Sequence, residues 1–263
     1  MTHFVPKGRN AHYWTKKDEM AAKAKEYLEY INENYKDEIA LSIKESKIFD
    51  PKKIDDSATI LGKDMPYIKL LPLDTVSAVS EAAAMGPEIV RGLAPKICAL
   101  NFASYKNPGG YFLGGSIAQE EAICHESTLY PVLTAFEKSF YEPNRKHLNK
   151  ALYYNRAIYS PDIVFEKDNL KTTASVLTCA APNFAAAEKY QHVSKEENTR
   201  VLKNRIKFVL DIMEYMGVDI PILGAFGCGV FGQDPTEVAE LFKAELDCRR
   251  FDYVLLGRKH SCP

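Results

Sequence analysis

Short apolar segments that alternate with amphipathic helical patterns constrain the fold more than any other feature of this chain. Four of them have the length of β-strands and are bounded by turn residues. They are KICALNFAS (96–104), ASVLTCAAPN (174–183), DIPILGAFG (219–227) and FDYVLLG (251–257). Helical spacing of apolar residues fills the intervals, at 117–140, 195–216 and 236–247. Apolar strands that alternate with helices predict an α/β fold in which helices cover both faces of a sheet.

The first 55 residues differ in composition from this pattern. They are polar and charge-rich, with apolar residues at helical spacing over 16–35. We therefore predict a helical extension, residues 1–55, packed on a main domain of residues 56–263. Within that domain, residues 141–172 are the least regular and predict a long excursion with one strand near AIYSPDIVF.

Composition excludes several function classes. The chain has 263 residues, with 34 basic and 35 acidic side chains. Because it has no excess of basic residues, we do not expect sequence-specific nucleic-acid binding. No apolar run approaches the length of a membrane helix, and the first twenty residues lack the apolar core of a signal peptide. The six cysteines are scattered without a C-x-x-C pair, and the histidines show no metal-ligand spacing. We expect free thiols, a cytoplasmic protein, no metal and no membrane contact.

The first of two glycine-rich loops, NPGGYFLGGSIAQEE, follows the segment KICALNFAS. Ser116 and Gln119 have the spacing of a capping box, so we predict a helix that begins there and carries Glu120 and Glu121 in its first turns. Consecutive helical residues do not face each other, which favours one glutamate for chemistry and the other for positioning a ligand. A purely structural interpretation stays open, because acidic residues also stabilise helix N-termini.

The second loop, GAFGCGVFGQDP (224–235), follows DIPIL. Asp234 is predicted to cap a helix that has Pro235 in its first position and Glu237 at the capping-box position. Successive backbone N–H groups in such a loop can bind phosphate. The loop also fits G-x-G-x-x-G, but Asp252 begins its strand, whereas the acid of a dinucleotide-binding fold ends one. Cys228 could be a nucleophile, although a small packed residue is the favoured interpretation.

Together these motifs resemble the catalytic domain of microbial-type poly(ADP-ribose) glycohydrolases. The family signature is a glycine triplet, a short spacer and Gln-Glu-Glu. Gly109, Gly110 and the run Gln119 to Glu121 match it, and LNFAS and GCGVF are similar to family segments. The resemblance covers residues 60–257, with IYSPDIVF and APN as weaker matches. It implies a macrodomain fold, a three-layer α/β/α arrangement around a mixed sheet.

The resemblance implies roles for individual residues. Glu121 is the catalytic acid and then the base, and Glu120 holds the ribose hydroxyls. Backbone donors to the diphosphate come from Gly227, Cys228 and Gly229, and Phe231 packs against the terminal ribose. The remaining ligand-binding residues are expected to be Asn101, which would contact a ribose, with Asn107, Gly109, Gly110, Gln119 and Val230.

One position departs from the signature. Tyr111 stands where the family has its third glycine, so its ring must point away from the ligand or narrow the site. The implied activity is hydrolysis of the ribose–ribose bond of poly(ADP-ribose), without cofactor or metal. Poly(ADP-ribose), ADP-ribose and ADP-ribosylated proteins are the implied partners, and the DNA damage response is the implied setting.

Alternatives to this function stay open. The first is removal of single ADP-ribose groups, which a narrowed site would favour. The second is a reader that binds ADP-ribose without cleaving it, although such a protein gains nothing from two carboxylates near a diphosphate. The third is a nicotinamide-dependent oxidoreductase built on Gly227 to Gly232.

Overall fold

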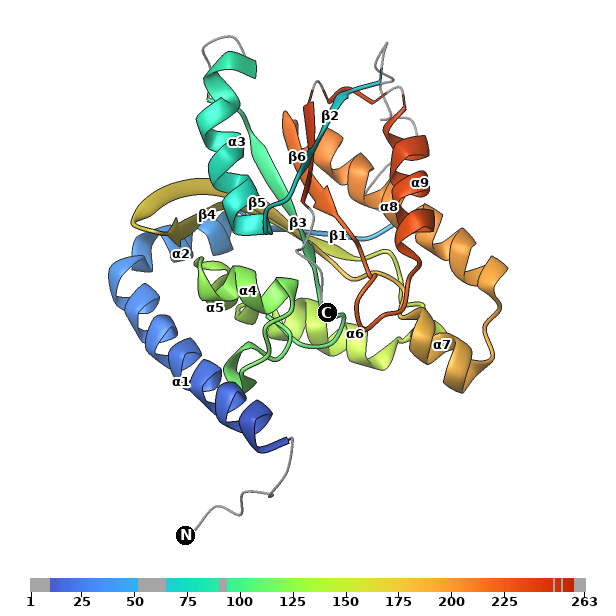
Figure 1. Cartoon of the computed structure of the whole chain (residues 1–263), viewed down its shortest axis with the longest axis horizontal. Helices are drawn as coiled ribbons and strands as arrows, with labels where there is room; N and C mark the ends of the chain where they lie inside the picture. The colour runs from blue at the N-terminus through green and yellow to red at the C-terminus, as the bar shows by residue number, and fades with distance from the viewer. Residues whose placement is uncertain (1–9, 52–64, 90–93, 248, 252, 258–263) are drawn as a thin grey trace.

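The computed structural model describes residues 10–51, 65–89, 94–247, 249–251 and 253–257 (Figure 1). The strands of this part of the chain are β1 (Lys47–Phe49), β2 (Tyr67–Leu71), β3 (Ile97–Phe102), β4 (Ala157–Lys167), β5 (Leu170–Cys179), β6 (Ile220–Gly224) and β7 (Tyr253–Gly257). They form a single sheet in the order β1-β4-β5-β3-β6-β7-β2. The pairs β1–β4 and β4–β5 are antiparallel, and the remaining pairs are parallel. The sheet is therefore mixed, as the resemblance implied.

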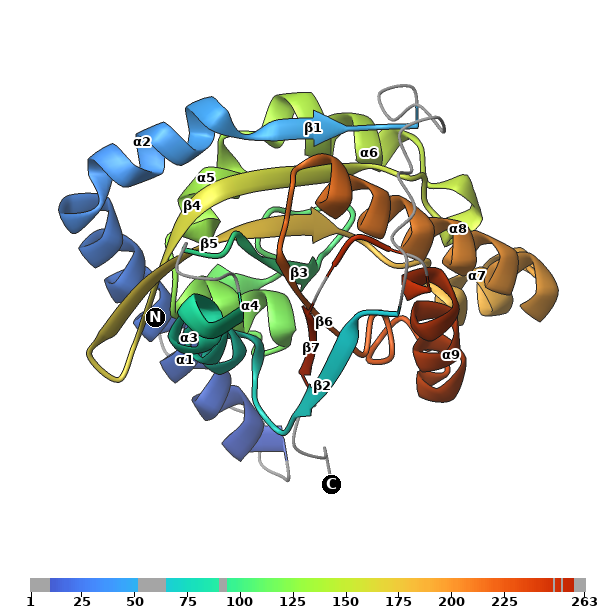
Figure 2. The ribbon, with the colours of Figure 1, turned by 90° about the horizontal axis from the view of Figure 1, so that it is seen from above.

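Helices cover both faces of this sheet (Figure 2). The longer ones are α1 (Asn10–Asn34), α2 (Lys36–Glu45), α3 (Thr75–Ile89), α8 (Lys195–Tyr215) and α9 (Pro235–Leu246). Side chains alternate along β3: Ile97 and Ala99 join one buried cluster with α3, while Cys98 and Leu100 join a second cluster with α8 and α9. The three-layer arrangement predicted from the apolar strands is confirmed.

The starts of helices α8 and α9 lie where the sequence predicted them. Helix α8 begins after Ser194, whose hydroxyl accepts the N–H of Glu197, and the predicted apolar stripe lies on its buried side. Asp234 caps α9 by accepting the N–H groups of Thr236 and Glu237, with Pro235 in the first turn. Strand β4 confirms the strand predicted near AIYSPDIVF. None of the described helices has the length and apolar character needed to cross a bilayer.

The single helix predicted over 117–140 is wrong. The structure divides this region into α4 (Gln119–His125), α5 (Leu129–Thr134) and a π-turn (Glu137–Tyr141), followed by α6 (Glu142–Lys146). The break between α4 and α5 comes from pairing with a strand: Ser127 bridges Phe165 of β4, and the N–H of Thr128 donates to the carbonyl of Val164 at 2.9 Å. Two short 3₁₀ turns, η2 (Phe112–Gly114) and η4 (Asn149–Ala151), and helix α7 (Phe184–Gln191) complete the described elements.

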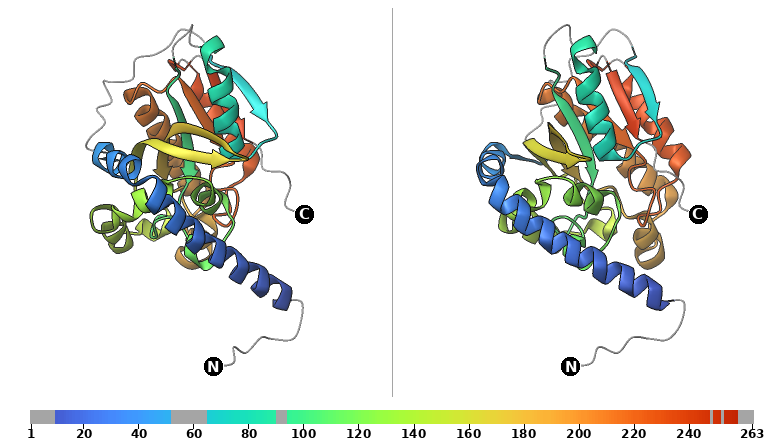
Figure 3. Two further views of the ribbon diagram at one scale, coloured as in Figure 1. Left: turned by 90° about the vertical axis from the view of Figure 1, so that its left-hand side faces the viewer. Right: turned by 60° about the vertical axis from the view of Figure 1, so that its left-hand side comes forward.

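The N-terminal segment is extensively attached to the rest of the molecule (Figure 3). Ala24 and Ile31 of α1 are buried in the core, and Tyr35 donates a hydrogen bond to Glu166 of β4 at 2.9 Å. Strand β1, at the end of this segment, forms one edge of the sheet next to β4. The predicted boundary between residues 55 and 56 lies outside the described residues.

Candidate active site

The two glycine-rich loops leave neighbouring parallel strands at the same edge of the sheet. The first begins after Phe102 at the end of β3, and the second begins after Gly224 at the end of β6 (Figure 1). In open α/β sheets, ligands bind beyond the carboxyl ends of the strands. The topology therefore brings both predicted loops to one ligand-binding edge.

Glu120 is buried, and the end of β3 holds its carboxyl group from two directions. Its Oε2 accepts the N–H of Ser104 at 2.7 Å, and its Oε1 accepts Nδ2 of Asn101 at 3.2 Å. The same Nδ2 lies 3.3 Å from Oγ1 of Thr178, the register partner of Asn101 on β5. Asn101 therefore ties Glu120 to two adjacent strands, and its own Oδ1 has no partner in the part of the chain described.

Burial raises the pKa of Glu120 to about 8. The N–H of Ser104 and the amide of Asn101 oppose this rise because they stabilise the ionised form, while the negative charge of neighbouring Glu121 adds to it. A carboxyl group with this pKa is mostly protonated at neutral pH. It can therefore donate a hydrogen bond as well as accept one.

Glu121 is 6% exposed and lies against the first glycine-rich loop. Its Oε1 accepts the N–H of Tyr111 at 2.9 Å. Gly110 has a φ of +62°, and a Cβ at this position would overlap Oε1 of Glu121 and lie 3.1 Å from Oε2 of Glu120. Glycine is therefore required at 110, because its bare Cα packs directly against both carboxyl groups.

Gln119 fixes the start of α4, but not through the predicted capping box. The helix begins at Gln119 itself, with Ala118 at the N-cap and no side-chain cap. The side chain of Gln119 accepts the N–H of Phe102 at 2.8 Å and donates to the carbonyl of Leu100 at 2.9 Å and the hydroxyl of Thr75 at 3.0 Å. The pairing with Ser116 was wrong because these contacts with β3 and α3 satisfy the amide instead.

Tyr111 is 61% exposed, yet its ring has a defined place. The ring packs onto Gly114, where a Cβ would overlap it, and Nζ of Lys17 on α1 lies 4.7 Å from its centroid. The bulk that replaces the third signature glycine thus lies between the turn and α1.

The second loop leaves most of its backbone donors available. In the part of the chain described, the N–H groups of Gly227, Gly229, Val230 and Phe231 donate to no protein acceptor. The N–H of Cys228, another predicted donor, is engaged within the loop by the carbonyl of Ala225 at 3.1 Å. The Val230 side chain is 87% exposed. Several adjacent free N–H groups can bind an anionic oxygen.

Burial raises the pKa of the Cys228 thiol to about 11. A thiol with this pKa is protonated at neutral pH and is a poor nucleophile. His125, on α4, makes an edge contact with Phe112, and its pKa is lowered chiefly by burial. Among the described residues, His, Cys, Asp and Glu side chains form no cluster that could hold a metal ion.

Two groups near the site were not found from the sequence. Tyr105 and Tyr153 stack with ring centroids 4.2 Å apart, and Phe231 meets Tyr153 edge-on at 6.0 Å. Arg205 is fully buried behind the end of β5, where it donates to the carbonyl of Ala180. Tyr105 directly follows LNFAS, so its place next to a family segment could have indicated it as a site residue. Tyr153 lies in the least regular part of the sequence, where no pattern indicates it.

The other predicted ligand residues lie close to this pair of loops. The carbonyl of Asn107 accepts the N–H of Gly110 at 3.2 Å, and the Asn107 side chain is exposed. Gly109, with a φ of +64°, packs against Tyr130, where a Cβ would lie 2.5 Å from Cδ2.

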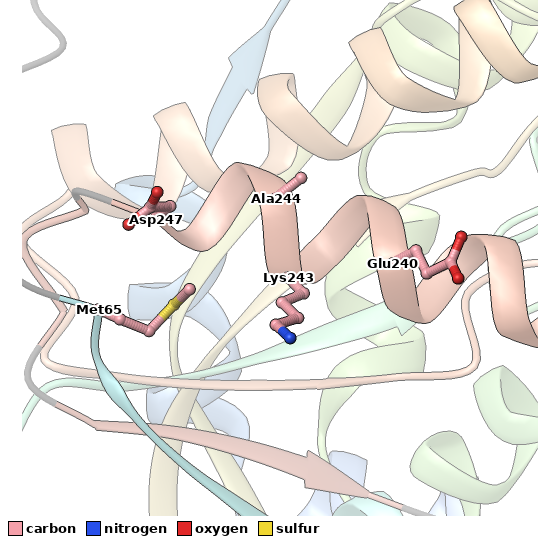
Figure 4. Close-up of a pocket in the computed structure, with 5 residues that line it drawn as sticks. All are labelled: Met65, Glu240, Lys243, Ala244 and Asp247. Carbon is pink, nitrogen blue, oxygen red and sulfur yellow. The ribbon is translucent and has the colours of Figure 1, made fainter.

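A separate pocket, which includes no residue of the two glycine-rich loops, lies at the end of α9 where β2 begins (Figure 4). Met65, Glu240, Lys243, Ala244 and Asp247 line it.

Comparison with known proteins agrees with this geometry. Residues 16–168 match the model of the family described as microbial-type PARG, catalytic domain. Poly(ADP-ribose) glycohydrolase from Thermomonospora curvata is 30% identical, with a TM-score of 0.83 over 94% of this chain and 95% of that one. The same enzyme bound to the inhibitor ADP-HPD is also similar, at 29% identity and a TM-score of 0.82 over the same shares of the two chains.

A second solved relative extends the comparison to a ligand complex. Poly(ADP-ribose) glycohydrolase from Deinococcus radiodurans in complex with ADP-ribose is 30% identical, with a TM-score of 0.75 over 86% of this chain and 92% of that one. No curated protein sequence matches the chain significantly.

Proposed function

The chain belongs to the family of microbial-type poly(ADP-ribose) glycohydrolase catalytic domains, and on that basis we propose how Glu120 and Glu121 carry out its reaction. It is a glycosidase that hydrolyses the ribose–ribose O-glycosidic bond of poly(ADP-ribose) and releases ADP-ribose. The observation that carries the proposal is the packing of Gly110 against both buried carboxyl groups. Bare backbone at that point lets the loop lie directly against both acids, which fixes the position of their carboxyl groups.

Glu121 is the proposed acid and base. It gives its proton to the departing ribose oxygen as the bond from the anomeric carbon to that oxygen breaks. The anomeric carbon becomes positively charged, and the ionised Glu121 stabilises that charge. Water then attacks the anomeric carbon and returns a proton to Glu121, which restores the starting state. The fixed bond from Tyr111 N–H to Oε1 leaves Oε2 for these transfers.

Glu120 is the proposed ribose holder. Ser104 and Asn101 fix its carboxyl group, so it presents a rigid partner to the ribose hydroxyls. Asn101 is proposed to contact a ribose through Oδ1, its unpaired atom among the described residues. Gln119, whose amide is engaged with β3 and α3, contributes mainly by orienting the start of α4.

The second loop is proposed to bind the diphosphate. The supporting feature is a set of N–H groups, at Gly227, Gly229, Val230 and Phe231, that donate to no acceptor among the described residues. The Phe231 ring, fixed by its edge contact with Tyr153, packs against the terminal ribose. Asn107 and Gly109 complete the proposed ligand contacts on the first loop.

We also propose a cellular setting for this activity. The substrate polymer is carried by ADP-ribosylated proteins, and its removal belongs to the DNA damage response. The cysteines at 98, 124, 179 and 228 are free thiols, which supports a reducing compartment such as the cytoplasm.

The test is release of ADP-ribose from purified poly(ADP-ribose) by the wild type and by Glu121→Gln. We expect kcat to fall by about 10²- to 10⁴-fold, the range for loss of a general acid. Binding of ADP-ribose, measured by calorimetry, should be retained. Glu126→Gln is the matched control: Glu126 lies just after α4 and pairs with Lys167 at 3.3 Å, so kcat should stay near the wild-type value.

Three outcomes would contradict the proposal. Equal activity of Glu121→Gln and the wild type would remove Glu121 from the acid role. Activity of the wild type only on single ADP-ribose groups would replace the polymer as substrate. Binding of ADP-ribose with no hydrolysis of either substrate would make the protein a reader.

A further inference from the structure

The turn that binds Glu121 is itself held by the N-terminal helix. Tyr111 gives its N–H to Glu121, so the position of this backbone group sets the position of the acid. The turn continues through the 3₁₀ element η2 (Phe112–Gly114) and ends at Gly115 with a φ of +80°. Its own hydrogen bonds include those from Phe112 N–H to Gly109 and from Gly115 N–H to Phe112, at 3.1 and 3.0 Å.

Helix α1 meets this turn at the level of the backbone. A Cβ at Gly115 would overlap the carbonyl oxygen of Lys17 and lie 3.0 Å from the amide nitrogen of Ala21. The glycine therefore lets the helix approach the turn more closely than any side chain would permit. Figure 3 shows α1 running past the loop region that precedes α4.

A side-chain contact reinforces this backbone contact. The Tyr111 ring packs onto Gly114, and the ammonium group of Lys17 lies over the ring, 4.7 Å from its centroid. A lysine ammonium over an aromatic ring is an attractive contact, and it joins α1 to the same residue that donates to Glu121. An exposed tyrosine without these two neighbours would be free to change rotamer.

The other end of α1 is anchored in the core. Ile31 is fully buried, and the hydroxyl of Tyr30 donates to Glu166 of β4 at 3.1 Å. Beneath the turn, the buried Phe112 packs on Tyr130 with centroids 4.8 Å apart. The helix thus connects a fixed point on the sheet to a turn whose displacement would move Glu121.

We propose that Tyr111 and Lys17 are positioning residues, through which helix α1 holds the Glu121-binding turn in its catalytic geometry. Neither side chain needs to touch the substrate for this role. The proposal rests on the proposed function, because it assumes that Glu121 is the acid. A shift of one ångström at a catalytic group can cost about 100-fold in rate, so a modest loosening of the turn is measurable.

The experiment compares Tyr111→Ala, Lys17→Met and the double variant in the full chain, with poly(ADP-ribose) as substrate. We expect kcat to fall about 10-fold for Tyr111→Ala and about threefold for Lys17→Met, with KM and the Kd for ADP-ribose unchanged. The double variant should match Tyr111→Ala alone, because the two residues act through one contact. Tyr111→Phe, which keeps the ring, should recover most of the lost kcat.

The matched control is Tyr215→Ala. Tyr215 is 60% exposed and makes a ring contact with Phe49, but it lies at the end of α8, away from the loops. Its removal should leave kcat unchanged. Melting temperatures for all variants separate loss of fold from loss of positioning.

Three results would overturn the proposal. One is an unchanged kcat in Tyr111→Ala. Another is a raised KM for the polymer at constant kcat, which would make Tyr111 a substrate contact. A third is additive loss in the double variant. Failure of the proposed function is a separate result, because a wild type without hydrolysis of poly(ADP-ribose) is detected before any variant is compared.

Discussion

The two glycine-rich loops have similar composition and opposite uses. In the first, backbone and side-chain polar groups are bonded to each other, and Gly110 is enclosed against two buried carboxyl groups. In the second, the N–H groups of Gly229, Val230 and Phe231 donate to no acceptor in the described part of the chain, and a Cβ at Gly229 would meet open space. Glycine thus serves close packing in one loop and ligand access in the other. Glycine count alone does not reveal the function of a loop; its hydrogen-bond partners do.

The largest expected effect tests the close packing of the first loop. In Gly110→Ala, the added Cβ must displace the Glu121 carboxylate, and the positive φ is strained as well. We expect kcat to fall by about 100-fold or more, because the acid moves relative to the ribose oxygen. Steady-state kinetics on poly(ADP-ribose) would measure it.

The control for this variant is Gly217→Ala. Gly217 also has a positive φ, +66°, but a Cβ there would meet nothing within 4 Å. It should lose about 1 kcal/mol of stability from backbone strain alone and keep its kcat. If both variants kept full activity, the enclosure of Gly110 would have no catalytic importance.

An intermediate effect concerns the acids at the two loops. The pKa of Glu120 is raised to about 8 by burial, whereas the pKa of Asp234 is lowered by the N–H groups of Glu237 and Thr236. An unfolded glutamate loses its proton near pH 4.3, so between about pH 4.3 and pH 8 Glu120 binds more protons in the folded state than in the unfolded chain. The contribution of Glu120 to the free energy of unfolding therefore falls as pH rises through this interval.

Glu120→Gln should remove that contribution. Relative to the variant, the wild type should lose up to about 1.4 kcal/mol of unfolding free energy per pH unit across the interval. Urea unfolding at pH 5, 6, 7 and 8 measures both slopes. Asp234→Asn should change the pH dependence of the unfolding free energy in the opposite direction. Ionised Asp234 stabilises the folded state, and this contribution is lost as pH falls through its lowered pKa. Parallel curves for the wild type and Glu120→Gln would contradict the assignment.

The smallest expected effect tests whether the second loop uses its backbone. In Cys228→Ser, the thiol becomes a hydroxyl of similar size while the backbone stays the same. We expect kcat within about twofold of the wild type, because the thiol, with its pKa raised to about 11, has no chemical role. Loss of activity comparable to that of Glu121→Gln would restore the alternative of a cysteine nucleophile.

Local sequence patterns predicted the elements whose ends are set by neighbouring residues. Helix α8 begins where Ser194 caps it, and α9 begins where Asp234 and Pro235 place it. The strands β3 and β6 follow from continuous apolar runs. These determinants lie within a few residues of each boundary, so no tertiary information is needed.

The failures involve contacts between residues far apart in the chain. The helical pattern over 117–140 is interrupted because residues 127 and 128 pair with β4, almost 40 positions later. Gln119 bonds to β3 rather than to Ser116. Strand β1 has only three residues and lies in a charged segment, so no alternation could mark it. Within the site, the signature indicated both glutamates, but the role of Thr178 as a support for Asn101 depends on strand register.

The hydrogen bond from Asn101 to Thr178 also bears on the order in which parts of the chain fold. These two residues are separated by 77 positions, and the strand that carries Thr178 must dock before the Asn101 amide is fixed. During synthesis, Asn101 and Glu120 leave the ribosome well before β5 does, so the Glu120 carboxyl group is hydrated and ionised at first. In the folded chain the same carboxyl group is buried, and burial raises its pKa. Asn101, which holds Glu120, is therefore held from both strands only when β5 lies beside β3.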